Sequence, residues 1–173
     1  MNQEHIEIVS YQDEHADAFS RLNREWLDKF ELYEEADGKH LYTPREYILD
    51  RGGEIFIAQE GKEVAGTCAI VPFADGVFEV AKLTVSRKCR GNGLGRELLE
   101  FALERARQRN AKRVVLLSSR KLVTALKLYE SIGFMHRPIP NNQPYETADV
   151  YMELELEFDP SRRVEPQMSL SGV

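Results

Sequence analysis

The residues with the clearest chemical meaning form a glycine-rich loop, Arg90-Gly91-Asn92-Gly93-Leu94-Gly95, between an expected strand and an expected helix. Glycines let the backbone turn sharply and bring consecutive N–H groups close to a ligand. The helix expected to begin near Gly93 adds the partial positive charge of its N-terminus. Such a loop suits the oxygens of a phosphate group, so it predicts a site for a small anionic ligand.

Two common nucleotide-binding motifs do not fit this loop. A Walker A loop needs Gly-Lys followed by Ser or Thr, which is absent here. A Rossmann fingerprint, G-x-G-x-x-G, would place its third glycine on Arg96 when started at Gly91. The preceding strand is also expected to belong to an antiparallel meander rather than to a leading strand–helix–strand unit. Both motifs are therefore excluded by the residues present.

The charge of the chain is uneven along its length. It has 23 Lys and Arg against 29 Asp and Glu, a net charge of −6. That balance argues against a general nucleic-acid binder, because neutralising phosphates needs a surplus of basic residues. The stretch 82–96 nevertheless holds basic residues and no acidic one: Lys82, Arg87, Lys88, Arg90 and Arg96. Positive charge concentrated around the glycine loop again favours a small anionic ligand.

Two segments together resemble a known family. Arg90-x-x-Gly93-x-Gly95, after Leu83-Thr84-Val85, is similar to the acyl-CoA pyrophosphate loop of the GNAT superfamily of N-acyltransferases. The segment 125–134, Ala-Leu-Lys-Leu-Tyr-Glu-Ser-Ile-Gly-Phe, resembles the family pattern A-x-x-L-Y-E-x-x-G-F. The segments follow the family's order, with a helix and a strand expected between them. The resemblance extends from about Ile6 to Leu156.

The resemblance implies a mixed α/β (α+β) fold with a mostly antiparallel central sheet. The sheet should be splayed between its fourth and fifth strands and flanked by about four helices. At 173 residues the chain has the length of one domain. We expect the domain to span residues 1–158, and the aperiodic stretch 159–173 to form a C-terminal tail that is mobile or contacts a partner.

The resemblance also implies acetyl-CoA as the acyl donor. Backbone groups of Leu83 and Val85 should pair with the pantetheine amides, the N–H groups of 90–95 should hold the pyrophosphate, and Arg96 should add charge. Leu122 stands where many members have asparagine, so Ser119 either replaces that contact or caps a helix. The expected acyl-CoA-binding residues are Leu83, Thr84, Val85, Arg90, Gly91, Asn92, Gly93, Leu94, Gly95, Arg96, Ser119 and Ala125.

Two residues are candidates for the proton transfers of amine acylation. An alkylamine is mostly protonated at neutral pH, so a base must accept its proton. Glu79 is the candidate base; strand alternation places it on the face of Ala81 and Leu83, and some family members carry a glutamate at the matching position. Tyr129 matches the family tyrosine that donates a proton to the leaving sulfur. Otherwise Glu79 is a solvent-facing strand residue and Tyr129 an ordinary core aromatic.

The acceptor side is less defined by the sequence. In the family, the first two helices and the loop before the last strand shape the acceptor pocket, so Trp26, Tyr33 and Tyr145 are candidates for its lining. The acidic residues Glu31, Glu34, Glu35 and Asp37 form either a wall that attracts a cationic amine or a solvated helix end. Small amines, amino acids, antibiotics, peptide N-termini and protein lysines all stay open as acceptors.

Cysteines, histidines and hydropathy add further expectations. Cys68 alternates within an apolar strand and should be buried, whereas Cys89 should be an exposed loop thiol. Two cysteines make no disulfide framework, and the first residues do not read as a signal peptide, so a cytoplasmic location is expected. The histidines show no metal-ligand spacing and no apolar run is long enough for a membrane span. We expect no metal, nucleic acid or membrane partner, while a homodimer stays open.

The hydrophobic periodicity predicts the elements that position these residues. Four helices are expected, each with apolar residues at helical spacing. The first runs from about Asp13 to Phe30 and is followed by a break at Asp37-Gly38, and the second runs from Thr43-Pro44 to Arg51. The third runs from about Gly93 to Asn110 and the fourth from about Leu122 to Gly133. Leu94, Leu98, Phe101, Ala102 and Ala106 mark the buried face of the third. Expected strands are Ile6–Ile8, Glu54–Gln59, Val64–Val71, Val77–Val85, Val114–Leu117, a short strand entered at Phe134, and Val150–Phe158.

The sequence thus predicts an acetyl-CoA-dependent N-acetyltransferase that moves an acetyl group directly to a primary amine within a ternary complex. The alternative is a non-catalytic acyl-CoA-binding sensor or regulatory module.

Overall fold

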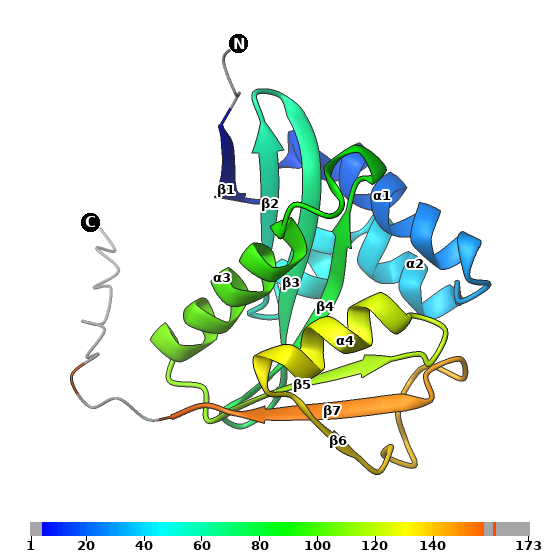
Figure 1. Cartoon of the computed structure of the whole chain (residues 1–173), viewed down its shortest axis with the longest axis vertical. Helices are drawn as coiled ribbons and strands as arrows, with labels where there is room; N and C mark the ends of the chain where they lie inside the picture. The colour runs from blue at the N-terminus through cyan, green and yellow to red at the C-terminus, as the bar shows by residue number, and fades with distance from the viewer. Residues whose placement is uncertain (1–4, 158–160, 162–173) are drawn as a thin grey trace, which may run out of the picture.

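A seven-stranded sheet in the order β1-β2-β3-β4-β5-β7-β6 organises the protein (Figure 1). The computed structural model describes residues 5–157 and residue 161. Every neighbouring pair of strands is antiparallel except β4–β5, which is parallel. The strands are β1 (Ile6–Ser10), β2 (Glu54–Glu60), β3 (Glu63–Ala74), β4 (Val77–Val85), β5 (Arg113–Ser118), β6 (Met135–Arg137) and β7 (Val150–Glu155). The expected antiparallel meander of β2, β3 and β4 is confirmed.

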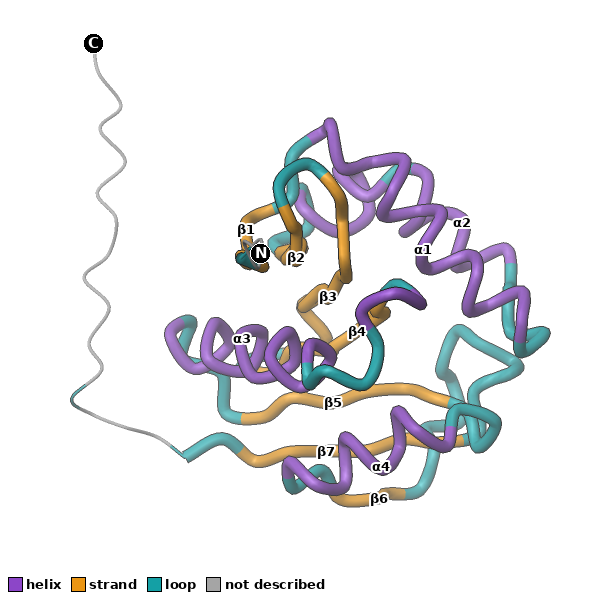
Figure 2. Tube along the Cα trace, turned by 45° about the horizontal axis from the view of Figure 1, so that its top comes forward, coloured by secondary structure: helices purple, strands orange, loops and turns teal. Residues whose placement is uncertain are grey.

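Helices cover both faces of this sheet, as Figures 1 and 2 show. They are α1 (Ala16–Lys29), α2 (Glu35–Tyr42), α3 (Leu94–Gln108) and α4 (Val123–Ile132). Helix α3 and helix α4 pack on one face through a large apolar cluster that includes Phe56, Leu98 and Met152. Helix α1 and helix α2 cover the opposite face of β2 and β3, where Phe19 and Leu41 pack against the strands. The alternation of side chains along each strand divides the core in this way.

The sheet opens between β4 and β5, as the resemblance implied. The two strands pair only from Val77 to Glu79, and the last pair is Glu79 with Val115. Beyond this fork β4 continues along β3, whereas β5 continues along β7. The edges of β4 and β5 that face each other past the fork therefore lack a strand partner.

A β-bulge in β4 changes which face its residues present. Thr67 pairs with Thr84 and Ala69 with Ala81, so that Lys82 and Leu83 oppose one residue of β3. Before the bulge Val80 packs against the α3–α4 cluster, and after it Leu83 packs against the same cluster. The expectation that Glu79 shares a strand face with Leu83 is therefore wrong, because the extra residue shifts the alternation by one.

The second helix differs from the prediction. Helix α2 spans Glu35–Tyr42, and the expected Thr43–Arg51 helix is reduced to a short π-helical turn, Arg45–Leu49. Asp37 does not break the helix, because its carboxylate accepts the N–H of Glu34 (2.9 Å) in a capping box. Gly38 leaves room for the neighbouring Tyr33 side chain, since a Cβ there would lie 2.8 Å from the Tyr33 hydroxyl, which would have to move.

Two further expectations need correction. Phe101 is 43% exposed and packs edge-on against Phe56 instead of facing the core, while Leu99 and Leu103 of α3 are buried. The last strand ends at Glu155 instead of Phe158, and residue 158 lies outside the described residues, as does 159–173 except for Ser161. Both faces of β7 contribute to packing, since Tyr151 is buried with Val77 and Val115.

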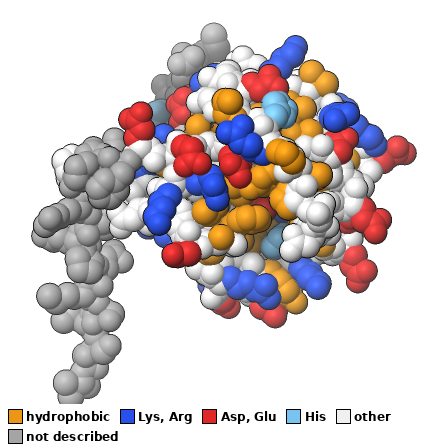
Figure 3. Space-filling model, turned by 90° about the horizontal axis from the view of Figure 1, so that it is seen from below, with side chains coloured by type: hydrophobic (Ala, Val, Ile, Leu, Met, Phe, Trp, Pro, Cys, Tyr) orange, Lys and Arg blue, Asp and Glu red, His pale blue; other side chains and the backbone are white. Residues whose placement is uncertain are grey.

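Charges of both signs are mixed over the surface seen from below in Figure 3. Basic and acidic side chains lie beside one another around apolar ones, and they do not gather into one basic area on this face.

Candidate functional site

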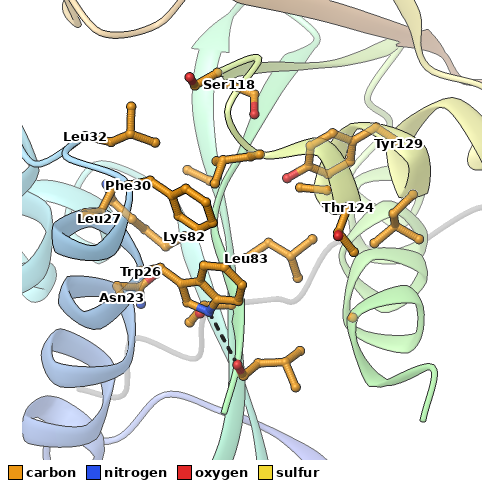
Figure 4. Close-up of a pocket in the computed structure, with 18 of the residues that line it drawn as sticks. Asn23, Trp26, Leu27, Phe30, Leu32, Lys82, Leu83, Ser118, Thr124 and Tyr129 are labelled. Atoms are coloured by element: carbon orange, nitrogen blue, oxygen red, sulfur yellow. Dashed lines mark hydrogen bonds between the residues drawn. The ribbon is translucent and has the colours of Figure 1, made fainter. Parts of the chain in front are cut away.

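A cleft of about 750 Å³ lies where β4 and β5 separate. Its walls come from α1, from β4 with the loop that follows it, from the β5–α4 segment, and from residues 145–148 before β7. Figure 4 shows Trp26 and Phe30 pointing into this space from α1, with Tyr129 of α4 on the other side of β4. Polar groups at its base and apolar side chains along its walls are typical of a small-molecule site.

The glycine loop forms one end of the cleft. Gly91 and Gly93 both have φ 81°, a left-handed conformation that glycine adopts without strain. Gly93 is the N-cap of α3, and no side chain caps this end of the helix. The first N–H groups of the helix are thus left for an external acceptor, and nothing within 4 Å fills the space beside either glycine.

The structure brings most of the predicted acyl-CoA-binding residues to the cleft, but not all of them. Those that line it are Leu83, Thr84, Val85, Arg90, Gly91, Gly93, Leu94, Gly95, Ser119 and Ala125. Asn92 and Arg96 are not among its lining residues. Arg96 instead forms an ion pair with Glu100 (3.4 Å) and donates to the Ser131 hydroxyl (2.6 Å).

The basic run 82–96 is not a set of free cations. Lys82 pairs with Asp37, Arg87 with Glu25 and Lys88 with Glu63, at 2.6, 2.6 and 2.7 Å. Arg90 donates to the carbonyl of Val85 and lies over the Trp26 ring at 3.8 Å. Of the two features that the sequence analysis offered for anion binding, the backbone N–H groups and the helix terminus are available, whereas most of the side-chain charge is already paired.

Strand β4 presents backbone groups to the cleft. The Lys82 carbonyl and the Ser86 N–H face β3, where they bond to the Thr67 hydroxyl (2.7 Å) and the Ala65 carbonyl (2.8 Å). Because backbone groups alternate between the two edges of a strand, those of Leu83 and Val85 face the gap beside β5. The Val85 carbonyl is already occupied there by the Arg90 guanidinium and the Trp26 indole, whose N–H lies 3.4 Å away (Figure 4).

One buried hydroxyl on this strand has no partner. Thr84 is 5% exposed, and within the described residues its Oγ1 makes no hydrogen bond. A buried hydroxyl without a partner costs free energy, so a ligand or an ordered water is expected to supply one.

Glu79 lies at the fork of the two strands. It belongs to the last residue pair that joins β4 to β5 and it lines the cleft. Burial raises the pKa of its carboxyl to about 7, and the nearby Lys82 ammonium opposes part of that rise. A carboxyl with a pKa near neutrality can accept a proton and release it at physiological pH.

Tyr129 lies on α4 with its ring packed edge-on against Phe134 (5.9 Å between centroids). Burial raises the pKa of its phenol above the ordinary value, so the hydroxyl is protonated at neutral pH. Its side chain lines the cleft, and no hydrogen bond engages its hydroxyl within residues 5–157. The arrangement leaves one phenolic proton free to be donated into the cleft.

The far end of the cleft is built from long-range side-chain contacts. Glu34 accepts the N–H groups of Glu146 (2.9 Å) and Thr147 (3.1 Å), which ties the segment before β7 to α2. The Tyr145 hydroxyl bonds to Nδ1 of His40 (3.3 Å). Tyr145 and Thr147 of this segment line the cleft together with Glu79.

Only some of the aromatic and acidic candidates for the acceptor side line the cleft in the structure. Trp26 and Tyr145 line the cleft, but Tyr33 does not: its ring lies under the Arg24 guanidinium at 3.5 Å. Asp37 also lines the cleft, though as the partner of Lys82, whereas Glu31 and Glu35 are exposed. The acidic segment is therefore neither one wall nor a uniformly solvated helix end.

The remaining candidates are also placed. Ser119 does not cap α4; its hydroxyl accepts the Lys121 N–H (3.3 Å) two residues on, and Leu122 is the N-cap. Cys68 is fully buried as expected, whereas the expectation that Cys89 is exposed is wrong: it is partly buried, because it lines the cleft. Among the described residues no group of three His, Cys, Asp or Glu side chains is placed to hold a metal ion.

Lys82 is the main site residue that sequence reasoning overlooked, since it was counted only as part of a basic run. Its left-handed backbone and its partner Asp37, 45 residues away, are set by the tertiary structure. The one local signal was a second charged residue, after Glu79, within a mostly apolar strand, which strand periodicity alone does not explain.

Comparison with known proteins identifies the class to which this site belongs. A model of the acetyltransferase (GNAT) family matches residues 13–134. The chain belongs to this family.

Particular relatives are similar in sequence or in fold. The chain is 30% identical to N-acetyltransferase 8 of Rattus norvegicus over 95 residues, which cover 52% of this chain and 43% of the relative. A GNAT-family acetyltransferase of Staphylococcus aureus superposes with a TM-score of 0.81 at 17% identity, over 88% of this chain and all of that one. The paiA N-acetyltransferase of Thermoplasma acidophilum, solved with coenzyme A, has a TM-score of 0.69 at 16% identity, over 88% and 99% of the two chains.

The chain therefore spans less than half the length of the mammalian relative it matches. In the part of the chain that the structure describes, no helix combines the length and apolar character that crossing a bilayer requires.

Proposed function

We propose that this protein transfers an acetyl group from acetyl-CoA directly to a primary amine in a ternary complex. The observation that carries this proposal is that Glu79 and Tyr129 line one cleft with an uncapped helix N-terminus and an unpaired strand edge. The Thermoplasma neighbour, which was solved with coenzyme A, supports the same use of the fold.

The donor half of the cleft fits acetyl-CoA, which supplies an activated acyl thioester when bound. The free N–H groups at the start of α3 suit the pyrophosphate oxygens. Backbone groups of Leu83 and the N–H of Val85, on the unpaired edge of β4, suit the amides of the pantetheine arm. Because Arg90 and Trp26 occupy the Val85 carbonyl, Leu83 carries more of this pairing than the sequence alone implied.

Glu79 is proposed as the base. Its position at the fork puts a carboxylate beside the place where the two halves of the cleft meet. With a pKa of about 7, a large fraction of this carboxyl is ionised at neutral pH and ready to accept a proton, directly or through water.

Tyr129 is proposed as the acid. Its phenol keeps its proton at neutral pH, and within the described residues its hydroxyl has no competing hydrogen bond. A departing thiolate gains from a donor of this kind within hydrogen-bond reach.

Direct transfer is favoured over a covalent acyl-enzyme. Cys89 lies in the short 3₁₀ turn before the glycine loop rather than at the fork, and no histidine is bonded to it among residues 5–157. A cysteine nucleophile usually needs such a base beside it. The two unpaired cysteines also agree with the reducing cytoplasm that we propose as the location.

The test is a bisubstrate assay with acetyl-CoA and a panel of amines, covering alkylamines, aralkylamines, polyamines, amino acids, peptide N-termini and lysine peptides. We expect free CoA to form together with a product heavier by one acetyl group. Initial-rate plots should show the intersecting lines of a ternary complex. Binding of acetyl-CoA without transfer to any member of the panel would contradict catalysis and favour the sensor alternative.

A further inference from the structure

The bulge residue of β4, Lys82, combines two costly features. Its φ of 54° lies in the left-handed region, which residues other than glycine rarely adopt. Its ammonium lies 2.6 Å from Oδ1 of Asp37, and the two side chains are only 9% and 4% exposed. Buried ion pairs are often no more stabilising than apolar residues of the same volume. Stability alone therefore does not explain why this pair occupies the cleft.

The surroundings of the pair include the proposed base. Lys82 follows Glu79 by three residues, and both line the cleft together with Asp37. The Lys82 ammonium is the charge that opposes the effect of burial on the Glu79 pKa. Asp37 is itself anchored, because its second oxygen accepts the N–H of Glu34 (2.9 Å) at the start of α2.

Other ionisable groups lie on the elements around Glu79 and this pair, although of them only Tyr145 lines the cleft. Their side chains come from α2, from the segment before β7, and from the strands beside β4. They are Glu34, His40, Tyr145, Arg113, Tyr151 and Glu153. Most have partners of their own: His40 bonds to Tyr145, Glu34 to Thr147, and Tyr151 donates to Glu153 (2.9 Å). Among the cations of the described residues, Lys82 is the one that lowers the pKa of Glu79.

The ion pair with Asp37 determines where the Lys82 ammonium lies. The Lys82 ammonium lines the same cleft as the buried Glu79 carboxyl, and an ammonium is attracted to such a carboxylate when no other acid holds it. A base locked in an ion pair with that ammonium could not accept a proton from an amine. With Asp37 bound to Lys82, positive potential reaches Glu79 while the carboxylate stays open.

We propose that the Asp37–Lys82 pair is a positioning device for Glu79, in which Lys82 keeps the buried carboxyl able to ionise and Asp37 restrains the ammonium from binding it. The inference rests on the proposed role of Glu79 as base. It assigns Asp37 and Lys82 a part in the reaction without contact with the reacting atoms.

The test is a ¹³C NMR titration of the Glu79 carboxyl, whose signal is assigned by its loss in Glu79→Gln. Lys82→Met removes the positive charge and should move the titration midpoint up by about one pH unit. Asp37→Asn frees the ammonium to approach Glu79 and should move the midpoint down. Lys82→Arg keeps the charge and should stay near the wild-type midpoint. Lys88→Met, in the exposed pair with Glu63 outside the cleft, is the matched control and should change nothing.

Opposite shifts in Lys82→Met and Asp37→Asn support the device, because a pair that served only the fold would not act on the Glu79 carboxyl and would leave its midpoint unchanged in both variants. Shifts in the same direction, or no shift in either, overturn it. Should Lys82→Met fail to fold, Asp37→Asn decides alone: a downward shift supports the proposal, and an unchanged or raised midpoint overturns it. The titration needs no acceptor, so it is independent of activity. An active Glu79→Gln enzyme would instead contradict the proposed function while leaving the titration result intact.

Discussion

The two ends of the cleft are built by different means. The donor end consists of backbone: glycines at positive φ, the uncapped start of α3 and the free edge of β4. The acceptor end consists of side chains from distant segments, such as Asp37 with Lys82 and Glu34 with Thr147. A backbone site leaves a short motif in the sequence, whereas a side-chain site depends on which elements the fold brings together.

This difference has a functional consequence. Backbone N–H groups bind any pyrophosphate of the right shape, so the donor end suits a ligand shared by a whole family. Contacts between distant side chains can change one pair at a time, so under the proposed function we expect substrate choice to be set at the acceptor end. The predictions below separate the two ends by experiment, from the largest expected effect to the smallest.

The strongest expected effect concerns Tyr129 at the junction of the two ends. Tyr129→Phe removes the phenolic proton but keeps the ring in contact with Phe134. We expect kcat to fall by about 100-fold, which is the lower range for loss of a general acid. Affinity for acetyl-CoA, measured by calorimetry, should hardly change. Tyr11→Phe, at another buried tyrosine outside the cleft, is the control and should retain full turnover. Equal rates for wild type and Tyr129→Phe would remove the acid role.

The donor end is tested through Gly93. Gly93→Val forces a β-branched residue to φ 81°, at a cost of about 1–3 kcal/mol. Distortion of the α3 N-terminus should weaken acetyl-CoA binding by roughly 5- to 150-fold. Gly61→Val, in the β2–β3 turn at φ 59°, imposes similar backbone strain away from the cleft. It should lower stability but leave affinity unchanged, and an equal loss of affinity in both variants would contradict a direct role of the loop.

The acceptor end predicts a pH-dependent stability effect at Glu79. Its folded pKa, about 7, lies above the ordinary value of 4.5, so the fold favours the protonated carboxyl. The carboxyl therefore destabilises the protein progressively as pH rises from about 4.5 to about 7. Glu79→Gln should be more stable than wild type by about 1–3 kcal/mol at pH 8, and no more stable at pH 4. Urea unfolding at the two pH values measures this difference in stability. The same difference at both pH values would argue against a buried carboxyl with a raised pKa.

Local motifs made the donor end predictable. The glycine loop, the start of α3 and the end of α4 at Gly133 all follow from residues that are neighbours in sequence. The strand meander and the order of the elements followed from periodicity and turn residues. These features depend on short-range backbone preferences, which a single sequence expresses.

Tertiary contacts made the acceptor end unpredictable. Asp37-Gly38 has the composition of a helix break, yet α2 continues through it because Asp37 is anchored by Glu34 and Lys82. The bulge at Lys82 shifted the face of every later residue in β4, and no local pattern marks it. Tyr33 and Tyr145 look equivalent as aromatic candidates, but only Tyr145 faces the cleft.

The central claim is that the cleft between β4 and β5 is an acyl-CoA site. The most direct measurement is a thermal-shift series with acetyl-CoA, CoA, ATP and NAD. A ligand at 100 times its dissociation constant adds about 2.7 kcal/mol, which raises the melting temperature by roughly 5–10 °C in a chain of this size. We predict such a rise with the two CoA species alone. No rise with either of them, or a rise with ATP or NAD instead, would contradict the account.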